Sequence, residues 1–161
     1  MEELELIPGY DYPQEMVALF QEYTRMLVEN NSSFQQYLDL QNYEAEIRDL
    51  ELKYGPPGGR LYLARCGGEA VGCIALRRLD EHRGELKRLY VRPAYRGRGF
   101  ATTLVRRIIQ DAREAGYTQL LLDTEPFLKA ALRLYRSFGF YEIPCYNDSP
   151  LDTTIFLQLD L

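Results

Sequence analysis

Two glycines and two arginines stand together in the segment Arg96-Gly97-Arg98-Gly99, between an apolar strand-like run and a long helical pattern. Glycine permits left-handed dihedral angles and close approach of the backbone to a ligand. The unpaired N–H groups of a first helical turn, with the positive end of the helix dipole, bind anions, and two guanidinium groups add charge that suits phosphate. The expected ligand is therefore a phosphate or a pyrophosphate. The alternative is a tight turn with two solvated arginines.

Two widespread phosphate-binding motifs fit this segment less well. The chain contains no GxxxxGK[ST] sequence, which excludes a P-loop. Gly97 and Gly99 match the first two glycines of a dinucleotide-binding GxGxxG, but Thr102 stands at the third position. That fingerprint belongs to a repeated parallel βαβ unit, and no second unit follows here. A dinucleotide is therefore not the expected ligand.

Residues suited to nucleophilic or metal chemistry are sparse elsewhere. The single histidine, His82, stands in a polar run typical of a turn, so neither a Ser-His-Asp triad nor a metal site is expected. The cysteines Cys66, Cys73 and Cys145 lack CxxC spacing and lie in apolar stretches. This pattern favours buried thiols in a reducing cytoplasm. Cys145 as a nucleophile is the alternative.

The charge of the chain is unevenly distributed. Its 161 residues include 24 acidic and 19 basic ones, for a net charge of −5. Residues 84–107 hold seven bases and one acid, whereas residues 1–52 hold 12 acids and two bases. A net acidic chain with one basic stretch suits a small anion better than nucleic acid. The longest uncharged stretch, 30–38, has nine mostly polar residues, so neither a membrane span nor a signal peptide is expected.

The periodicity of the first half predicts helices followed by an antiparallel meander. A short extended segment opens the chain, and apolar residues from Met16 to Leu27 recur at helical spacing in a helix that begins near Pro13. Residues 34–54 are expected to form one helix or two. The pattern then alternates, and strands are predicted over 61–66, 70–79 and 85–91. Their short connections require antiparallel pairing.

The second half alternates helices with strands. Helices are predicted from after Pro93 to Gly116 and from Pro126 to Gly139, with each glycine at the usual C-terminal place. Strands are predicted over 117–122, 140–145 and 153–159. The order β-α-α-β-β-β-α-β-α-β-β indicates a single α+β domain over residues 1–161, with helices flanking a mixed, mostly antiparallel sheet.

Three parts of the chain resemble the GNAT superfamily of acetyl-CoA-dependent N-acetyltransferases. The residues Arg96 to Ala101 resemble its Q/R-x-x-G-x-G/A motif, and Leu89 to Pro93 resemble the preceding strand. The segment from Ala131 to Phe140 resembles the family's A-x-x-L-Y-x-x-x-G-F ending, and the order of elements matches along essentially the whole chain. The resemblance implies the GNAT fold and an enzyme that transfers an acetyl group from acetyl-CoA to an amine.

The resemblance also implies where acetyl-CoA binds, in a cleft where two neighbouring parallel strands part. The pantetheine arm would pair with the backbone of Leu89 and Val91, and a backbone N–H near Tyr90 or Val91 would meet the developing oxyanion. Family members often carry Asn seven residues before the helix tyrosine, where this chain has Leu128, with Lys129 beside it. The pyrophosphate would lie on backbone N–H groups of Arg96, Gly97, Arg98, Gly99, Phe100, Ala101 and Thr102.

Two side chains are the catalytic candidates. Glu85 resembles the position of the family's catalytic glutamate, and a carboxylate acting through a water can take a proton from an amine. Its alternative is a hairpin residue paired with Arg83 or Lys87. The phenol of Tyr135 would protonate the departing thiolate. Its alternative is a core aromatic residue.

The acceptor is expected to be a small, amino-acid-like amine. Arg88 would bind its carboxylate or form a surface salt bridge instead, and the acidic N-terminal helices leave a peptide or protein amine or a polyamine open. A non-catalytic CoA-binding sensor or interaction module is the rival function, and a homodimer stays open. The resemblance implies that the two N-terminal helices and the last hairpin loop wall the acceptor side, where this chain has Phe34, Tyr37, Tyr43, Tyr146 and Asn147.

Overall fold

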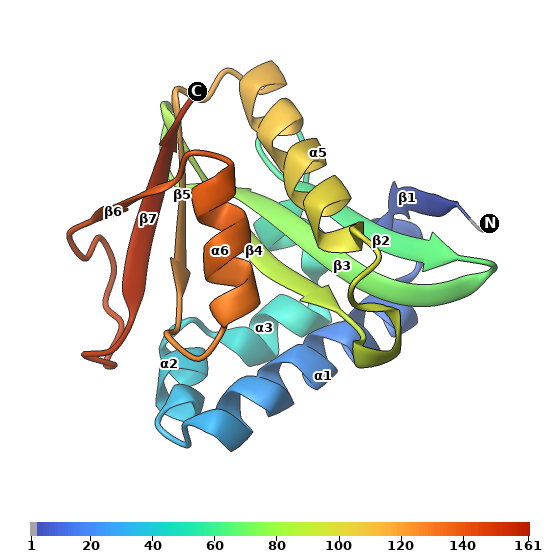
Figure 1. The fold of residues 1–161 in the computed structure, drawn as a ribbon, viewed down its shortest axis with the longest axis horizontal. Helices are drawn as coiled ribbons and strands as arrows, with labels where there is room; N and C mark the ends of the chain where they lie inside the picture. Colours follow the sequence, from blue (N-terminus) through green and yellow to red (C-terminus); the bar gives the residue numbers. More distant parts are fainter. Residues whose placement is uncertain (1–2) are drawn as a thin grey trace.

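A mixed sheet of seven strands forms the centre of the molecule, in the order β1-β2-β3-β4-β5-β7-β6. The computed structural model describes residues 3–161, and Figure 1 shows helices on both faces of the sheet. Neighbouring strands are antiparallel except β4 and β5, which are parallel. The α+β class and the mixed sheet are thus confirmed. The strands are β1 (Leu4–Pro8), β2 (Arg60–Cys66), β3 (Glu69–Arg78), β4 (Arg83–Val91), β5 (Gln119–Thr124), β6 (Tyr141–Ile143) and β7 (Ile155–Asp160).

Two groups of helices cover the two faces of the sheet (Figure 1). The N-terminal group is α1 (Pro13–Asn30), α2 (Phe34–Leu40), α3 (Tyr43–Arg48) and α4 (Leu50–Tyr54). The opposite face carries α5 (Phe100–Glu114) and α6 (Lys129–Ser137). Within residues 3–161, no helix has both the length and the apolar character needed to cross a membrane.

The region 34–54, predicted as one helix or two, forms three short helices. Asn42 adopts a left-handed φ of 57° between α2 and α3. Asp49 leaves the helical conformation between α3 and α4, and its side chain accepts a hydrogen bond from the backbone N–H of Leu52. Asparagine and aspartate favour such breaks because their side chains bond to nearby backbone.

Other boundaries also differ from the prediction, and β5 and β7, for example, each begin two residues later than expected, at Gln119 and Ile155. Helix α6 begins at Lys129 rather than at Pro126. Strand β6 ends at Ile143, since Pro144 follows and has no N–H to donate to a ladder. Cys145 consequently lies in an irregular segment and is exposed, so the expectation of a buried thiol was wrong there. Cys66 and Cys73 are buried as expected.

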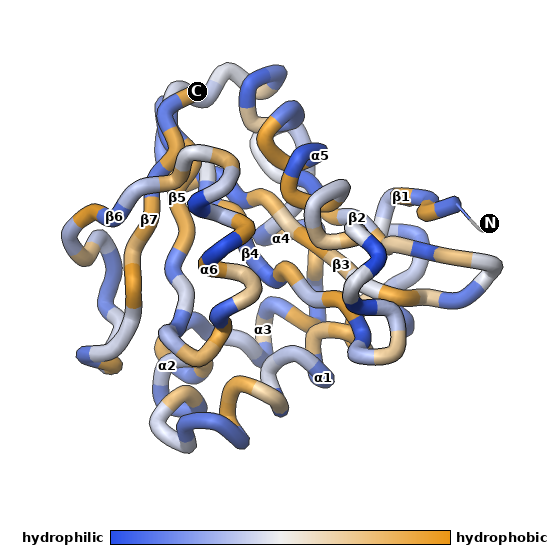
Figure 2. Tube along the Cα trace, viewed as in Figure 1, coloured by the Kyte–Doolittle hydropathy of each residue, from blue (hydrophilic) through white to orange (hydrophobic). Residues whose placement is uncertain are grey.

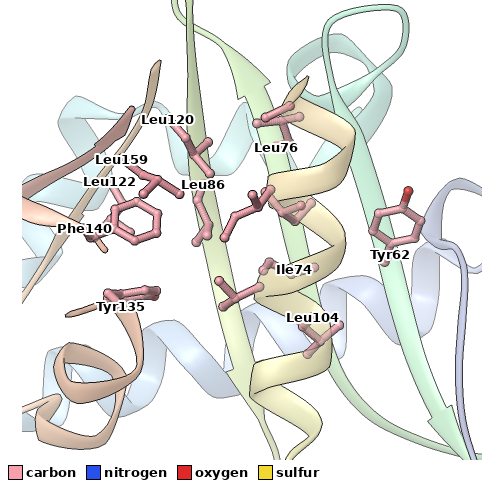
Figure 3. Packing of buried hydrophobic residues seen from close by; sticks show 14 of the residues in the cluster. Tyr62, Ile74, Leu76, Leu86, Leu104, Leu120, Leu122, Tyr135, Phe140 and Leu159 are labelled. Atoms are coloured by element: carbon pink, nitrogen blue, oxygen red, sulfur yellow. The ribbon is translucent and has the colours of Figure 1, made fainter. Parts of the chain in front are cut away.

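Side chains of the central strands alternate between two apolar layers. Ile74 and Leu76 of β3 pack in the layer beneath α5 and α6, whereas Cys73 and Ala75 pack in the layer formed with α1 to α4. Figure 3 shows part of the first layer. Figure 2 shows apolar residues following one side of α5, where it faces the sheet. The central strands are therefore a wall shared by both halves of the molecule.

A β-bulge in β4 interrupts this alternation. Between the pairs Cys73–Tyr90 and Ala75–Lys87, one residue of β3 faces two residues of β4. Arg88, in the bulge, has a φ of 61°, a left-handed value that is uncommon for a residue other than glycine. The extra residue bends the strand and increases its local twist.

Strands β4 and β5 separate at this bulge. Their parallel register covers Arg83–Glu85, which pair with Gln119–Leu121. Figure 1 shows the two strands running apart beyond this point, with α6 in front of them. The part of β4 from Leu89 to Val91 thus presents backbone that is not paired with β5.

Candidate active site

An apolar cleft of about 460 Å³ opens where β4 and β5 separate. This volume is within the range of ordinary small-molecule sites. Its walls come from β4 after the bulge, the turn before α5, the first turn of α5, and α6. All of the predicted cofactor residues except Arg98 line it, namely Leu89, Tyr90, Val91, Arg96, Gly97, Gly99, Phe100, Ala101 and Thr102.

The turn before α5 contributes two glycines to this cleft, beside Tyr95 and Arg96. Gly97 and Gly99 both have a φ of 80°, and Gly99 directly precedes the helix. The Nε of Arg96 donates to the carbonyl oxygen of Val91 over 2.8 Å. Arg98 is exposed and does not line the cleft, but its guanidinium lies 5.3 Å from the ring centre of Tyr95, which does. Anion binding here would depend on the helix N-terminus and on Arg96 more than on Arg98.

Replacing Gly99 with alanine should weaken CoA binding by about tenfold, or about 1.4 kcal/mol, measured by calorimetry. A Cβ at Gly99 meets no protein atom within 4 Å, so it would occupy cleft space beside the helix N-terminus. Gly116→Ala is the matched control because Gly116 has a φ of 90° and an equally open Cβ position at the other end of α5. Both variants should lose similar thermal stability. Equal CoA affinity in both would contradict the prediction.

Tyr135 lies on the α6 side of the apolar cleft. Its side chain lines the cleft although the residue is only 5% exposed, and its ring packs against Phe140 at 5.6 Å between centres. Burial holds the pKa of the phenol well above its ordinary value of 10. The hydroxyl therefore stays protonated at neutral pH. Leu128 and Lys129 also line the cleft, so an apolar side chain fills the place where many family members have Asn.

A second, polar pocket of about 270 Å³ lies on the side of the N-terminal helices. It contains Glu85, so the two catalytic candidates lie in different hollows. Among the described residues, none lines both. The lining of the polar pocket is Tyr37, Leu40, Gln41, Lys53, Arg77, Leu79, Glu85, Lys87, Tyr146, Asn147 and Asp148.

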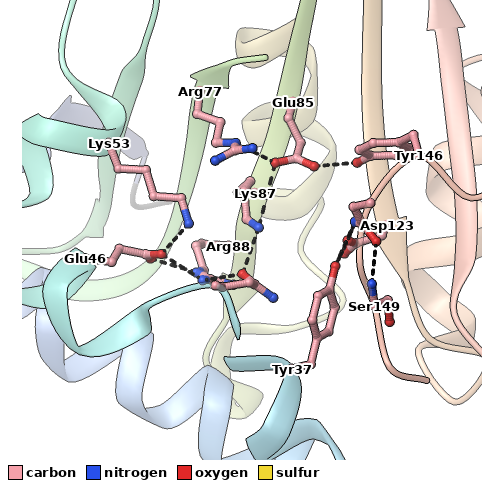
Figure 4. A network of polar contacts seen from close by, with 12 residues as sticks. Tyr37, Glu46, Lys53, Arg77, Glu85, Lys87, Arg88, Asp123, Tyr146 and Ser149 are labelled. Carbon is pink, nitrogen blue, oxygen red and sulfur yellow. Dashed lines mark hydrogen bonds and ion pairs between the residues drawn. The ribbon is translucent and has the colours of Figure 1, made fainter. Parts of the chain in front are cut away.

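Glu85 is buried among cations and a tyrosine (Figure 4). Its Oε1 lies 2.9 Å from the Nε of Arg77 and 3.7 Å from the Nζ of Lys87, and Tyr146 donates a hydrogen bond to its Oε2. Burial alone would raise the pKa of Glu85, but Lys87, Arg77 and the Tyr146 hydrogen bond hold it below its ordinary value. The group is therefore ionised at neutral pH. The alternative partner Arg83 was wrong, since Arg83 pairs with Asp80 at 2.7 Å.

Asp123 lies behind the wall of the polar pocket, where it contacts Tyr37 and Asn147, and it was not predicted as a site residue. Its Oδ2 accepts hydrogen bonds from the hydroxyl of Tyr37 and from the Nδ2 of Asn147, the latter over 2.7 Å. Figure 4 shows α2 and the loop after β6 meeting at this carboxylate, where Ser149 donates its backbone N–H to the Oδ1 of Asn147. The sequence feature that could have indicated Asp123 is an acidic residue at the end of a buried strand, β5.

Arg88 is not placed as the sequence suggested. Its guanidinium is 4% exposed, and Nε and Nη2 each lie 2.9 Å from one carboxylate oxygen of Glu46. The expected surface salt bridge is therefore a buried one. Nη2 also donates to Gln41 over 3.0 Å, and Arg88 lines neither hollow. The bulge turns this side chain toward α3, which an unbroken strand alternation would not do.

Phe34 and Tyr43, the other expected wall residues, are buried in the apolar layer beneath the N-terminal helices. Among residues 3–161, no group of three or more His, Cys, Asp or Glu side chains is arranged to hold a metal ion.

Comparisons with known proteins place these features in a family. The Acetyltransferase (GNAT) family matches residues 10–140. An uncharacterized N-acetyltransferase of Schizosaccharomyces pombe is 38% identical over 140 residues, 85% of this chain and 86% of that protein. The N-acetylaspartate synthetase of Danio rerio is 34% identical over 130 residues, 74% of this chain and 46% of that protein. The Campylobacter jejuni N-acetyltransferase PseH in complex with acetyl coenzyme A shares the fold, with a TM-score of 0.63 at 17% identity over 98% of this chain and 99% of that one.

Proposed function

This chain belongs to the acetyltransferase (GNAT) family and is an N-acetyltransferase, and from that premise we propose that it acetylates the primary amine of a small, amino-acid-like molecule. The amine attacks the thioester of acetyl-CoA directly while both substrates are bound. The observation that carries the proposal is the apolar cleft, which is bordered by the helix N-terminus at one end and by the protonated Tyr135 on α6.

The cleft suits acetyl-CoA in both shape and chemistry. Open space at the Cβ positions of Gly97 and Gly99 leaves room for a pyrophosphate against the first turn of α5. The β4 backbone from Leu89 to Val91 is not paired with β5 and can pair with the amides of a pantetheine arm, although the Val91 carbonyl oxygen already accepts a hydrogen bond from Arg96. Acetyl-CoA supplies the activated acetyl group, and the chain supplies orientation and proton transfer.

Glu85 is proposed to accept the proton of the acceptor ammonium through a water. It is ionised, and its Oε1 lacks a hydrogen bond of good geometry although Arg77 is close. Tyr135 is proposed to give its proton to the departing thiolate, because its side chain lines the apolar cleft and its hydroxyl is protonated at neutral pH. A backbone N–H near Tyr90 or Val91 is proposed to stabilise the oxyanion.

The Glu85→Gln variant should show a defect in kcat that depends on pH. Near pH 7 an amine with a pKa of about 10 is almost fully protonated and needs a base, whereas near pH 9.5 much of it is already neutral. The ratio of wild-type to variant kcat should therefore be large near pH 7 and shrink as pH rises. A pH–rate profile parallel to that of the wild type would remove Glu85 as the proton acceptor.

The acceptor class rests on the size of the polar pocket and on one relative. The pocket of about 270 Å³ is better suited to a free small molecule than to a side chain that is still attached to a protein backbone. The name of the Danio rerio relative, N-acetylaspartate synthetase, denotes an N-acetylated amino acid as its product. Peptide amines and polyamines are the alternative acceptors.

A screen of free-thiol release from acetyl-CoA, with amino acids, peptides and polyamines as acceptors, tests the proposal. Calorimetry with CoA separates the two ways in which it could fail. CoA binding without thiol release for any amine would favour a non-catalytic sensor or interaction module. Absence of CoA binding at millimolar concentrations would overturn the assignment of the apolar cleft.

A further inference from the structure

We infer that the polar pocket binds a carboxylate of the acceptor, so that the amine acetylated by this chain belongs to a small molecule that is itself an acid. This inference rests on the proposed function, because it assigns the acceptor end of the same reaction. The residues that carry it are Lys53, Arg77 and Lys87, which line the pocket from α4, β3 and β4.

Two buried carboxylates, one in this pocket and one behind it, each form ion pairs with two cations. Glu46 lies 2.9 Å from the Nη2 of Arg88 and 2.7 Å from the Nζ of Lys53. Glu85 is likewise shared between Arg77 and Lys87. Each carboxylate carries one negative charge and contacts two cations. One positive charge in each group is therefore left without an anion of its own.

The contacts around Glu85 are incomplete as hydrogen bonds. The Nε of Arg77 and the Oε1 of Glu85 are 2.9 Å apart, yet their orientation leaves both buried atoms without a hydrogen-bond partner. The Nζ of Lys87 donates to the neutral side chain of Gln41 over 2.9 Å and is 3.7 Å from Glu85. Lys87 is only 8% exposed, and a buried cation is costly unless it is paired.

Among the described residues, no acid other than Glu46 and Glu85 forms an ion pair with Lys53, Arg77 or Lys87. Asp123 accepts hydrogen bonds from Tyr37 and Asn147, two neutral side chains of the pocket wall, and contacts none of the three cations directly. Asp148 is exposed at the rim, where water screens its charge. Burial, with Lys87 as the next cause, lowers the pKa of Lys53 to about 7, which agrees with an excess of positive charge.

A carboxylate entering the pocket would complete both sets of contacts. It would accept hydrogen bonds from Lys87 and from Arg77, which are charge-assisted and therefore among the stronger ones. An acceptor held in this way would place its ammonium near Glu85, whose Oε1 has ion-pair partners but no hydrogen bond of good geometry. A polyamine or a cationic peptide would instead place further positive charge beside three cations.

Acetyl transfer to amino acids and to their carboxamides provides the test. Each carboxamide keeps the amine and the side chain but lacks the negative charge. For the amino acids that are accepted, the carboxamide should show a kcat/KM lower by about tenfold or more, as expected for a lost hydrogen bond between charged groups. Lys87→Gln and Arg77→Gln should each reduce this discrimination, mainly through KM. Two variants are used because Lys87 is buried, whereas the Arg77 side chain is 36% exposed and tolerates replacement more easily.

Arg83→Gln is the matched control, since Arg83 lies on the same strand as Lys87 but pairs with Asp80 outside the pocket. This variant should discriminate as the wild type does. A binding measurement that needs no turnover runs beside the kinetics. NMR titration in the presence of CoA should show N-acetylglycine binding more tightly than N-acetylglycinamide, and Lys87→Gln should abolish the difference.

Equal kcat/KM for amino acids and carboxamides, or a preference for spermidine, would overturn the inference while leaving the acetyltransferase proposal intact. If no amine is acetylated, the titration decides the question by itself. Equal affinity for the two glycine derivatives would then exclude a carboxylate site.

Discussion

Tyr135→Phe should lower kcat by about 100-fold or more, the range expected when a general acid is removed. A thiolate whose conjugate acid has a pKa of about 8.5 leaves as an anion more slowly when no donor is in place. Phenylalanine keeps the ring that packs against Phe140, so stability and CoA affinity should stay near wild-type values. Steady-state kinetics and calorimetry with CoA measure the two quantities.

The Tyr135 prediction separates an acid from a packing residue. A role in packing alone would leave kcat unchanged in Tyr135→Phe. Tyr117→Phe is a suitable control, because its hydroxyl donates to the carbonyl oxygen of Gly58 and lies outside both hollows. Full activity of Tyr135→Phe would refute the proposed role, and so would an equal loss of activity in the control.

Arg88→Met should destabilise the protein by about 3 kcal/mol, which is the lower end of the range expected when one partner of a buried ion pair is removed. The carboxylate of Glu46, 1% exposed, would lose its bidentate partner and keep only Lys53 at 2.7 Å. Denaturant unfolding at pH 7 gives the value. Arg83→Met removes an exposed pair instead and should cost less than about 1 kcal/mol. Similar losses in the two variants would contradict the importance of the buried pair.

The effect of Arg88→Met should shrink in acid. Burial favours the protonated form of Glu46, but Arg88 and Lys53 hold its pKa in the wild type far below the ordinary 4.5. The stability from this lowered pKa is present above about pH 4.5 and is lost as pH falls below it, because the unfolded chain then binds the proton first. In the variant, protonation of Glu46 removes a buried negative charge that Lys53 alone does not pair adequately. The two unfolding free energies should therefore approach each other below pH 4.5, whereas a constant difference would argue for lost packing alone.

The elements that form the apolar cleft could be predicted from local sequence. Alternating and helical periodicities located most strands and helices, and the glycines of the turn before α5 indicated left-handed backbone. The residues from Leu89 to Thr102 are contiguous, so one short segment supplies most of the cleft. The contribution of α6 followed from the spacing around Tyr135 in the same way.

The polar pocket could be predicted only in part, because its residues come from distant segments. The resemblance indicated Glu85, Tyr37, Tyr146 and Asn147, whereas the cations Lys53, Arg77 and Lys87 were not predicted as pocket residues. The contact of Tyr37 with Asp123 and that of Tyr146 with Glu85 join residues far apart along the chain. No spacing rule connects α2 with the loop after β6. Of the two cations beside Glu85, Lys87 was among the predicted alternatives, whereas Arg77 was missed because it lies on β3 and becomes a neighbour through sheet register alone.

The bulge at Arg88 also shifts the alternation of side chains along β4 by one residue. Before it, the odd-numbered Glu85 and Lys87 line the polar pocket; after it, the even-numbered Tyr90 packs beneath the N-terminal helices, and Val91 packs in the opposite layer. The inserted residue exchanges the two sets of positions. A single strand therefore presents charged side chains to the polar pocket and backbone that is not paired with β5 to the apolar cleft. This geometry requires a fixed number of residues between Glu85 and Arg96, whatever the chemical nature of the side chains in that interval.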